Sequence, residues 1–125
     1  PIDTWIKVNV DGVTLGAPGP LGCGGTFRTH RSFVKGYFHH YIGIGTTNEA
    51  ELWAIIYEVK YDGFHNWHDL YLESDSQNAV AALNLKTRNV PWMLLHHWVE
   101  CLRLVHHLNL HATHTYREAN QVADA

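Results

Sequence analysis

The chain has 125 residues, of which 46% are hydrophobic and 17% charged, which predicts one globular domain with a buried core and excludes a disordered segment. With its eleven histidines neutral the net charge is −3, which excludes the strongly basic surface that many nucleic-acid-binding proteins carry. No apolar run is long enough to span a bilayer, so no membrane contact is expected.

The first part of the chain predicts three strands joined by turns. Apolar and polar residues alternate over residues 6–10, the period of a strand with one buried face, and the alternation stops at the turn pair Asp11-Gly12. A loop rich in glycine and proline follows at residues 16–22, and further strands are expected over Cys23–Arg28 and Phe33–Ile42. Consecutive strands joined by short turns form an antiparallel meander.

In the second part, helices alternate with strands. Helices are expected from Asn48 to about Tyr61, from Gln77 to about Leu85 and from Pro91 through Val105, strands over Asp69–Glu73 and Leu108–Tyr116, and a last helix from Ala119. Helices between successive strands imply parallel crossovers. The predicted fold is therefore α/β: a mixed five-stranded sheet, made of the three-stranded meander plus two parallel strands, flanked by helices. One domain is expected over residues 1–125, with its last helix truncated.

Four acidic residues stand at the ends of these elements, and each has a local explanation. Asp11 tolerates a turn, Glu51 completes a capping box opened by Asn48, Asp75 caps a helix, and Asp124 suits the dipole at a helix start. However, Asp11 and Asp75 also follow strands at the sheet edge where open α/β sheets bind ligands. Four acids at one edge would repel one another unless cations held them, and a set of hard oxygen ligands favours Mg²⁺ or Mn²⁺.

The segments around these acids carry a family resemblance. Val10-Asp11-Gly12, Thr46–Leu52, Glu73–Gln77 and His114–Asp124 together resemble the type 1 ribonuclease H family, in particular the plant form, found alone or in retrotransposon reverse transcriptases. The match runs in order over nearly the whole chain. The resemblance implies an RNase H-like fold and endonucleolytic cleavage of the RNA strand of RNA/DNA hybrids by a two-metal-ion mechanism.

The resemblance also implies roles for individual residues. The implied metal ligands are Asp11, Glu51, Asp75 and Asp124, which would hold two Mg²⁺ ions, with Mn²⁺ as a substitute. His114, ten residues before the last of these acids, would assist proton transfer or product release, with His111 as a nearby alternative. These five residues, the four acids and His114, form the implied catalytic set.

Contacts to the hybrid are implied for Gly12, Thr46, Asn48, Gln77 and Asn120. Asn48 and Gln77 match positions near the minor groove, where 2′-hydroxyl groups distinguish RNA from DNA. Gly12 would lie against a sugar, and Thr46 would hold a phosphate of the DNA strand. A cap and a solvated helix surface explain Asn48 and Gln77 equally well, so both interpretations stay open.

Other features set limits on this interpretation. Larger relatives carry a basic, tryptophan-rich protrusion, whereas here Pro91-Trp92 leads straight into a helix with Arg103 as its one Lys or Arg, so weak hybrid affinity is expected. The histidine pairs 39–40, 96–97 and 106–107 point apart and are expected at the surface rather than around zinc. The alternatives are a non-catalytic module that binds nucleic acid or protein, and a nuclease acting on DNA.

The cysteines and the absence of a signal-peptide pattern bear on the expected location of the domain. The two cysteines, Cys23 and Cys101, form no metal motif or disulfide framework, and no signal-peptide pattern opens the chain. We therefore expect an intracellular location, in the nucleus or the cytoplasm. A monomeric domain that is part of a larger polypeptide is expected.

Overall fold

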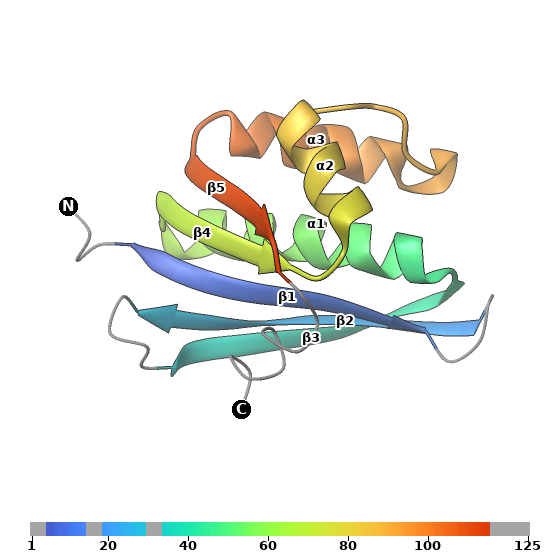
Figure 1. The fold of residues 1–125 in the computed structure, drawn as a ribbon, viewed down its shortest axis with the longest axis horizontal. Helices are drawn as coiled ribbons and strands as arrows, with labels where there is room; N and C mark the ends of the chain where they lie inside the picture. Colours follow the sequence, from blue (N-terminus) through green and yellow to red (C-terminus); the bar gives the residue numbers. More distant parts are fainter. Residues whose placement is uncertain (1–4, 15–18, 30–33, 116–125) are drawn as a thin grey trace.

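The fold is a five-stranded mixed sheet with helices packed on one face (Figure 1). The computed structural model describes residues 5–14, 19–29 and 34–115. The strands are β1 (Ile6–Thr14), β2 (Gly19–Thr29), β3 (Val34–Gly45), β4 (Asp69–Ser74) and β5 (Asn109–His114), and the α-helices are α1 (Thr47–His65), α2 (Gln77–Leu85) and α3 (Leu95–Val105). A 3₁₀ turn, Trp92–Leu94, precedes α3.

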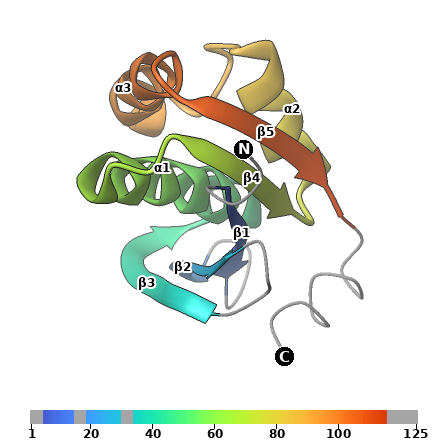
Figure 2. The same cartoon turned by 90° about the vertical axis from the view of Figure 1, so that its left-hand side faces the viewer.

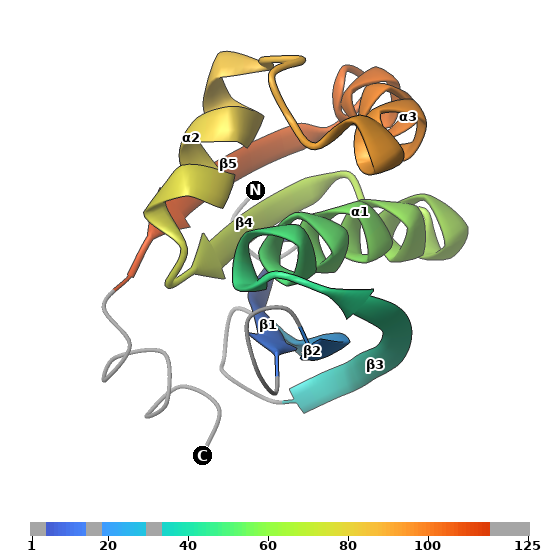
Figure 3. The same cartoon turned by 90° about the vertical axis from the view of Figure 1, so that its right-hand side faces the viewer.

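The strand order β3-β2-β1-β4-β5 confirms the predicted sheet. The pairs β1–β2 and β2–β3 are antiparallel, while β1–β4 and β4–β5 are parallel. Figures 2 and 3 show α1, α2 and α3 on the same side of the sheet, which we call the inner face. Among the described residues, no helix is apolar over a length that could cross a membrane.

The inner face and the helices form the core. Its largest fully buried side chain is Trp98 of α3, whose indole N–H donates a hydrogen bond of 2.8 Å to the carbonyl of Thr87. This bond gives the buried indole its polar partner and ties α3 to the segment that follows α2. The outer face of the sheet bears alternating side chains that point away from the described helices.

Strand pairing explains why two predicted boundaries in the meander are wrong. Strand β1 does not stop at the turn pair, because Asp11 and Gly12 continue the antiparallel ladder opposite Gly24 and Cys23. For the same reason β2 begins at Gly19, inside the predicted loop. The last predicted helix, from residue 119, lies outside the described residues.

Helix α1 begins and ends at other residues than predicted. Its cap is Thr46, whose hydroxyl accepts a hydrogen bond from the Glu49 N–H while the Glu49 side chain accepts one from the Thr46 N–H. This reciprocal capping box replaces the predicted one between Asn48 and Glu51. The helix runs past the predicted end to His65 and closes on a left-handed residue, Asn66.

Helix α1 also buries two acids that its apolar pattern does not reveal. Glu58 and Asp62 are fully buried one turn apart, and neither forms an ion pair with a described residue. Burial raises the pKa of Glu58 to about 7, and burial together with the charge of Glu58 raises the pKa of Asp62 to about 12. The Asp62 carboxyl therefore keeps its proton at neutral pH and shares it with Glu58.

This pair makes stability depend on pH. Because both pKa values are raised by folding, the folded protein holds protons more tightly than the unfolded chain. The contribution of this pair to the free energy of unfolding is therefore greatest near pH 4 and falls as pH rises, by up to about 1.4 kcal/mol per pH unit for each retained proton. Urea denaturation from pH 4.5 to 9 should show this decline, and Asp62→Asn should make it shallower, because Glu51, whose pKa is also raised, still contributes to it.

The matched control is Asp69→Asn at the partly buried start of β4, which should keep the wild-type slope. An Asp62→Asn profile parallel to that of the wild type would show that the buried pair does not control the pH dependence.

Candidate active site

Three of the four predicted acids converge in the described structure. Asp11 lies in β1, Glu51 in the first turns of α1 and Asp75 directly after β4, and one carboxylate oxygen from each lies within 4.8 Å of the other two. Within the described residues no other set of three His, Cys, Asp or Glu side chains converges in this way. We call these three residues the acidic trio.

The strand register explains how two of the acids meet. The parallel ladder of β1 and β4 ends at the pair Val10–Ser74, and the next residue on each strand is Asp11 or Asp75. Two carboxylates therefore leave the ladder side by side at the carboxyl ends of adjacent parallel strands. Ligand binding is predicted from the sequence at this same edge of the sheet.

Gly12 brings the third acid into place. A Cβ atom at Gly12 would lie 2.4 Å from the carbonyl carbon of Ala50 and 2.5 Å from the backbone nitrogen of Glu51. Only glycine therefore permits β1 to approach the start of α1 this closely. The backbone of Gly12 also acts on the Glu51 carboxylate, and it opposes the rise in the pKa of that group.

Glu51 is held in an environment that opposes its negative charge. Only 3% of the residue is exposed, and its Oε2 atom is buried without a hydrogen-bond partner among the described residues. Burial, followed by the charges of Asp11 and Asp75, raises the pKa of Glu51 to about 8, while the Gly12 N–H acts in the opposite direction. A bound cation would remove this repulsion and provide the missing partner.

The donor set fits a hard divalent cation. All three side chains offer carboxylate oxygens, which suit Mg²⁺ or Mn²⁺. A nearby thiol, Cys23, does not change this, because burial and the charge of Glu51 raise its pKa to about 12 and keep it neutral.

His114 flanks the acidic trio. It is the last residue of β5, opposite Ser74 in the parallel ladder, and its Nε2 lies 3.2 Å from the backbone carbonyl oxygen of Asp75. A carbonyl oxygen only accepts, so Nε2 carries the proton in this contact. The alternative, His111, packs near Tyr71 and Trp5 instead. The geometry therefore favours His114 of the two.

Three of the residues predicted to contact the hybrid are exposed in the described structure. Thr46 is the exposed cap of α1, Asn48 is exposed in its first turn, and Gln77 is exposed at the start of α2. Asn48 also lines a groove of about 430 Å³ between α1 and α2, together with Asn78, Thr87 and Asn89, which the sequence did not single out. Asp124 and Asn120 lie outside the described residues.

The chain matches the family model described as reverse transcriptase-like over residues 9–125. It is 31% identical over 125 residues to a protein of Arabidopsis thaliana with the provisional name ribonuclease H protein, covering 96% of this chain and 19% of that protein. It is 34% identical over 93 residues to the ribonuclease H of Blochmanniella floridana, covering 74% and 52%. The chain thus spans about a fifth and about half of these relatives.

Solved structures show the same fold. RNase H1 from Halobacterium salinarum superposes with a TM-score of 0.83 at 25% identity, covering 96% of this chain and 92% of that one. LC11-RNase H1 in complex with an RNA/DNA hybrid superposes with a TM-score of 0.80 at 24% identity, covering 95% and 91%.

Replacing Gly12 tests how the site is held together. Because the new methyl group of Gly12→Ala would collide with the backbone of α1, β1 and α1 must separate, which should lower stability by about 1–3 kcal/mol. The stabilisation by added Mn²⁺ should shrink with it, because Asp11 and Glu51 move apart. Thermal melts with and without Mn²⁺ measure both effects.

Gly36→Ala is the control, since nothing lies within 4 Å of a Cβ atom at that position. Equal melting temperatures and equal Mn²⁺ responses for the two variants would contradict the close approach at Gly12.

Proposed function

Since the chain belongs to the reverse transcriptase-like family, whose fold is that of ribonuclease H, we propose that it hydrolyses the RNA strand of RNA/DNA hybrids as a metal-dependent endoribonuclease. The observation that carries the proposal is the acidic trio, three carboxylates converging at the carboxyl ends of β1 and β4. A buried carboxylate beside two others of like charge is unfavourable in an ordinary core, and it has a use where cations bind.

The proposed ligands are Asp11, Glu51 and Asp75, with Asp124 as the fourth. When bound, two Mg²⁺ ions would supply an activated water and stabilise the leaving oxygen of the phosphodiester. The protein's own contribution is positioning: the β1–β4 register and the close contact at Gly12 hold the ligands before substrate arrives. Rigid ligands of this kind favour the geometry that cleavage needs.

His114 is proposed to assist proton transfer or product release. Its ring lies against the carbonyl of Asp75, beside the acidic trio, and it is exposed to solvent. An exposed imidazole beside the acidic trio can both donate and accept a proton, which suits this task.

Recognition of the hybrid is proposed to involve the exposed helix starts around the acidic trio. Asn48 and Gln77 present amide groups that both donate and accept hydrogen bonds, which suits 2′-hydroxyls and base edges in the minor groove. Thr46 caps α1, where backbone N–H groups favour a phosphate. A relative of this fold has been solved in complex with an RNA/DNA hybrid, which supports this assignment.

A non-catalytic binding module is the second candidate. The net charge is −3, and Arg103, the one basic Lys or Arg residue of α3, is paired with Glu100. Few cations are thus left for phosphate contacts on α3, and the domain would depend on a larger polypeptide for affinity. The Arabidopsis thaliana relative, of which the chain covers 19%, supports such a setting.

A cleavage assay separates the two candidates. With Mg²⁺ and a hybrid labelled on the RNA strand, the wild-type domain should release short RNA fragments, and EDTA should prevent this. Asp75→Asn should lower the rate at least about a hundredfold, because it removes a metal ligand. Asp69→Asn, which neutralises an acid at the opposite end of β4, away from the acidic trio, should retain the wild-type rate.

A folded wild-type domain that binds the hybrid but does not cut it with Mg²⁺ or Mn²⁺ would favour the binding module. Equal cutting of a DNA duplex would assign a different substrate, because selectivity for the hybrid requires the 2′-hydroxyls of the cut strand.

A further inference from the structure

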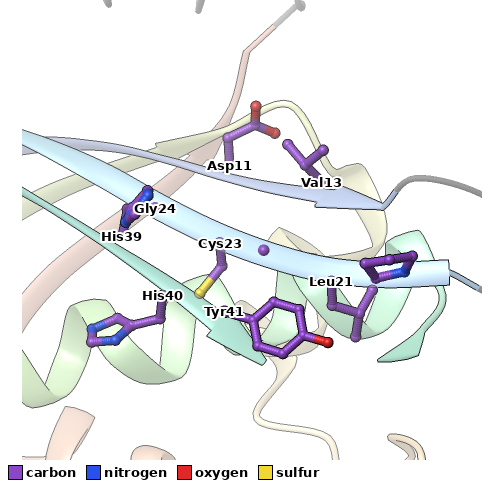
Figure 4. A pocket seen from close by; sticks show the side chains of 10 residues that line it. Asp11, Val13, Leu21, Cys23, Gly24, His39, His40 and Tyr41 are labelled. Atoms are coloured by element: carbon purple, nitrogen blue, oxygen red, sulfur yellow. The ribbon is translucent and has the colours of Figure 1, made fainter. Parts of the chain in front are cut away.

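The outer face of the meander forms a groove that begins at the acidic trio. Its volume is about 510 Å³, and Figure 4 shows its lining from the three antiparallel strands. On β1 it is lined by Asp11 and Val13, on β2 by the segment 20–24, and on β3 by the segment 39–41. None of its lining residues belongs to a described helix, and Asp11, Val13, His39 and Tyr41 place it on the outer face, whereas the side chains of Leu21, Cys23 and His40 point to the inner face.

The strand register defines the shape of the groove. Asp11 pairs with Gly24, which pairs with His39, and Val13 pairs with Gly22, which pairs with Tyr41. Directly paired residues point to the same face of a sheet. The central strand therefore contributes glycines without side chains, while β1 and β3 supply the walls about 10 Å apart. A flat ring can reach the backbone between these walls.

Strand β3 carries exposed aromatic rings on the outer face. Tyr41, which lines the groove, and Tyr37, which lies beside it, are 74% and 82% exposed, and with His39 they recur at every second residue of the strand. Among the described residues neither tyrosine packs on another ring, whereas the outer-face aromatics Trp5 and Tyr71 stack on each other at 4.4 Å. Exposed aromatics along a sheet are platforms on which single-stranded bases stack.

The rows of the outer face connect the groove with the acidic trio. Asp11, a proposed ligand of the ions that act on the RNA strand, lies in the row between that of Tyr41 and the row Asn9–Thr26–Tyr37. The row Lys7–Arg28 follows; Lys7 pairs with Glu73 at 3.1 Å, which leaves Arg28 able to bind phosphate. The groove thus continues the proposed substrate path rather than forming a separate apolar patch.

We propose that this groove binds unpaired nucleotides of the RNA strand adjoining the hybrid, stacked on Tyr41. The proposal rests on the proposed function, because it takes the RNA strand to pass Asp11. The domain would then prefer hybrids at the border of single-stranded RNA over blunt ones. This preference would add affinity to a domain with few basic residues.

Binding of labelled duplexes tests the proposal. With Ca²⁺ in place of Mg²⁺ to prevent turnover, fluorescence anisotropy would compare a blunt hybrid with hybrids bearing a six-nucleotide extension of the RNA strand at either end. One RNA extension should lower the Kd about tenfold, the size expected for stacking of one or two bases. An extension of the DNA strand should have no such effect.

Variants assign the effect to Tyr41. Tyr41→Ala should bring the ratio of blunt to extended Kd values close to one, and Tyr41→Phe should keep the ratio because a ring remains. Phe64→Ala is the matched control, since Phe64 is also 82% exposed but lies near the end of α1, outside the groove. Melting temperatures would confirm that each variant is folded.

Equal Kd values for blunt and extended hybrids, or a ratio unchanged by Tyr41→Ala, would overturn the groove as a binding site. A tyrosine-dependent dimer in sedimentation analysis without an RNA-extension effect would make the face a protein interface and also overturn it. Cleavage of the blunt hybrid with Mg²⁺, measured in parallel, separates these outcomes from failure of the proposed function, which would remove cleavage itself.

Discussion

The parallel contact between β1 and β4 is the constraint on which the site depends. It ends at Val10 and Ser74, so the next residues, Asp11 and Asp75, leave the sheet together. The contact between Gly12 and the start of α1 then adds Glu51 from the inner face. Three acids distant in sequence are thus fixed by backbone packing rather than by their own interactions, which are repulsive.

This arrangement has an energetic consequence. Glu51 is almost fully buried among like charges, and Glu58 and Asp62 lie further along the same helix with raised pKa values. Glu51 and the Glu58–Asp62 pair both oppose folding at neutral and higher pH. For Glu51, cation binding explains this cost, since ions that bind the folded state stabilise it. Nothing in the described structure gives the Glu58–Asp62 pair a comparable use.

Much of the fold follows from the sequence, because strand alternation, helix periodicity and crossover rules are strong signals. The predicted element boundaries are wrong where two local sequence signals compete. Asp11-Gly12 resembles a turn, and only pairing with β2 shows that the strand continues. Thr46 and Asn48 are both good caps, and the sequence does not decide between them.

The candidate site, too, could be predicted from the sequence only in part. Single acids have ordinary local explanations, and the joint resemblance of four segments selected Asp11, Glu51 and Asp75, which the fold then brings together. The buried acids of α1 carried a signal that could have been used, because Glu58 and Asp62 lie three residues after the buried Ile55 and Val59. The outer-face groove depends on the pairing of three strands and has no local signature.

Binding of divalent cations by the acidic trio is tested most directly by the anomalous electron density of crystals soaked in Mn²⁺. If the trio binds cations, peaks should appear that are coordinated by carboxylate oxygens of Asp11, Glu51 and Asp75, at two positions about 4 Å apart when hybrid is bound. Well-ordered carboxylates with no peak between them, at a Mn²⁺ concentration that supports cleavage of the hybrid in solution, would show that the trio does not bind cations.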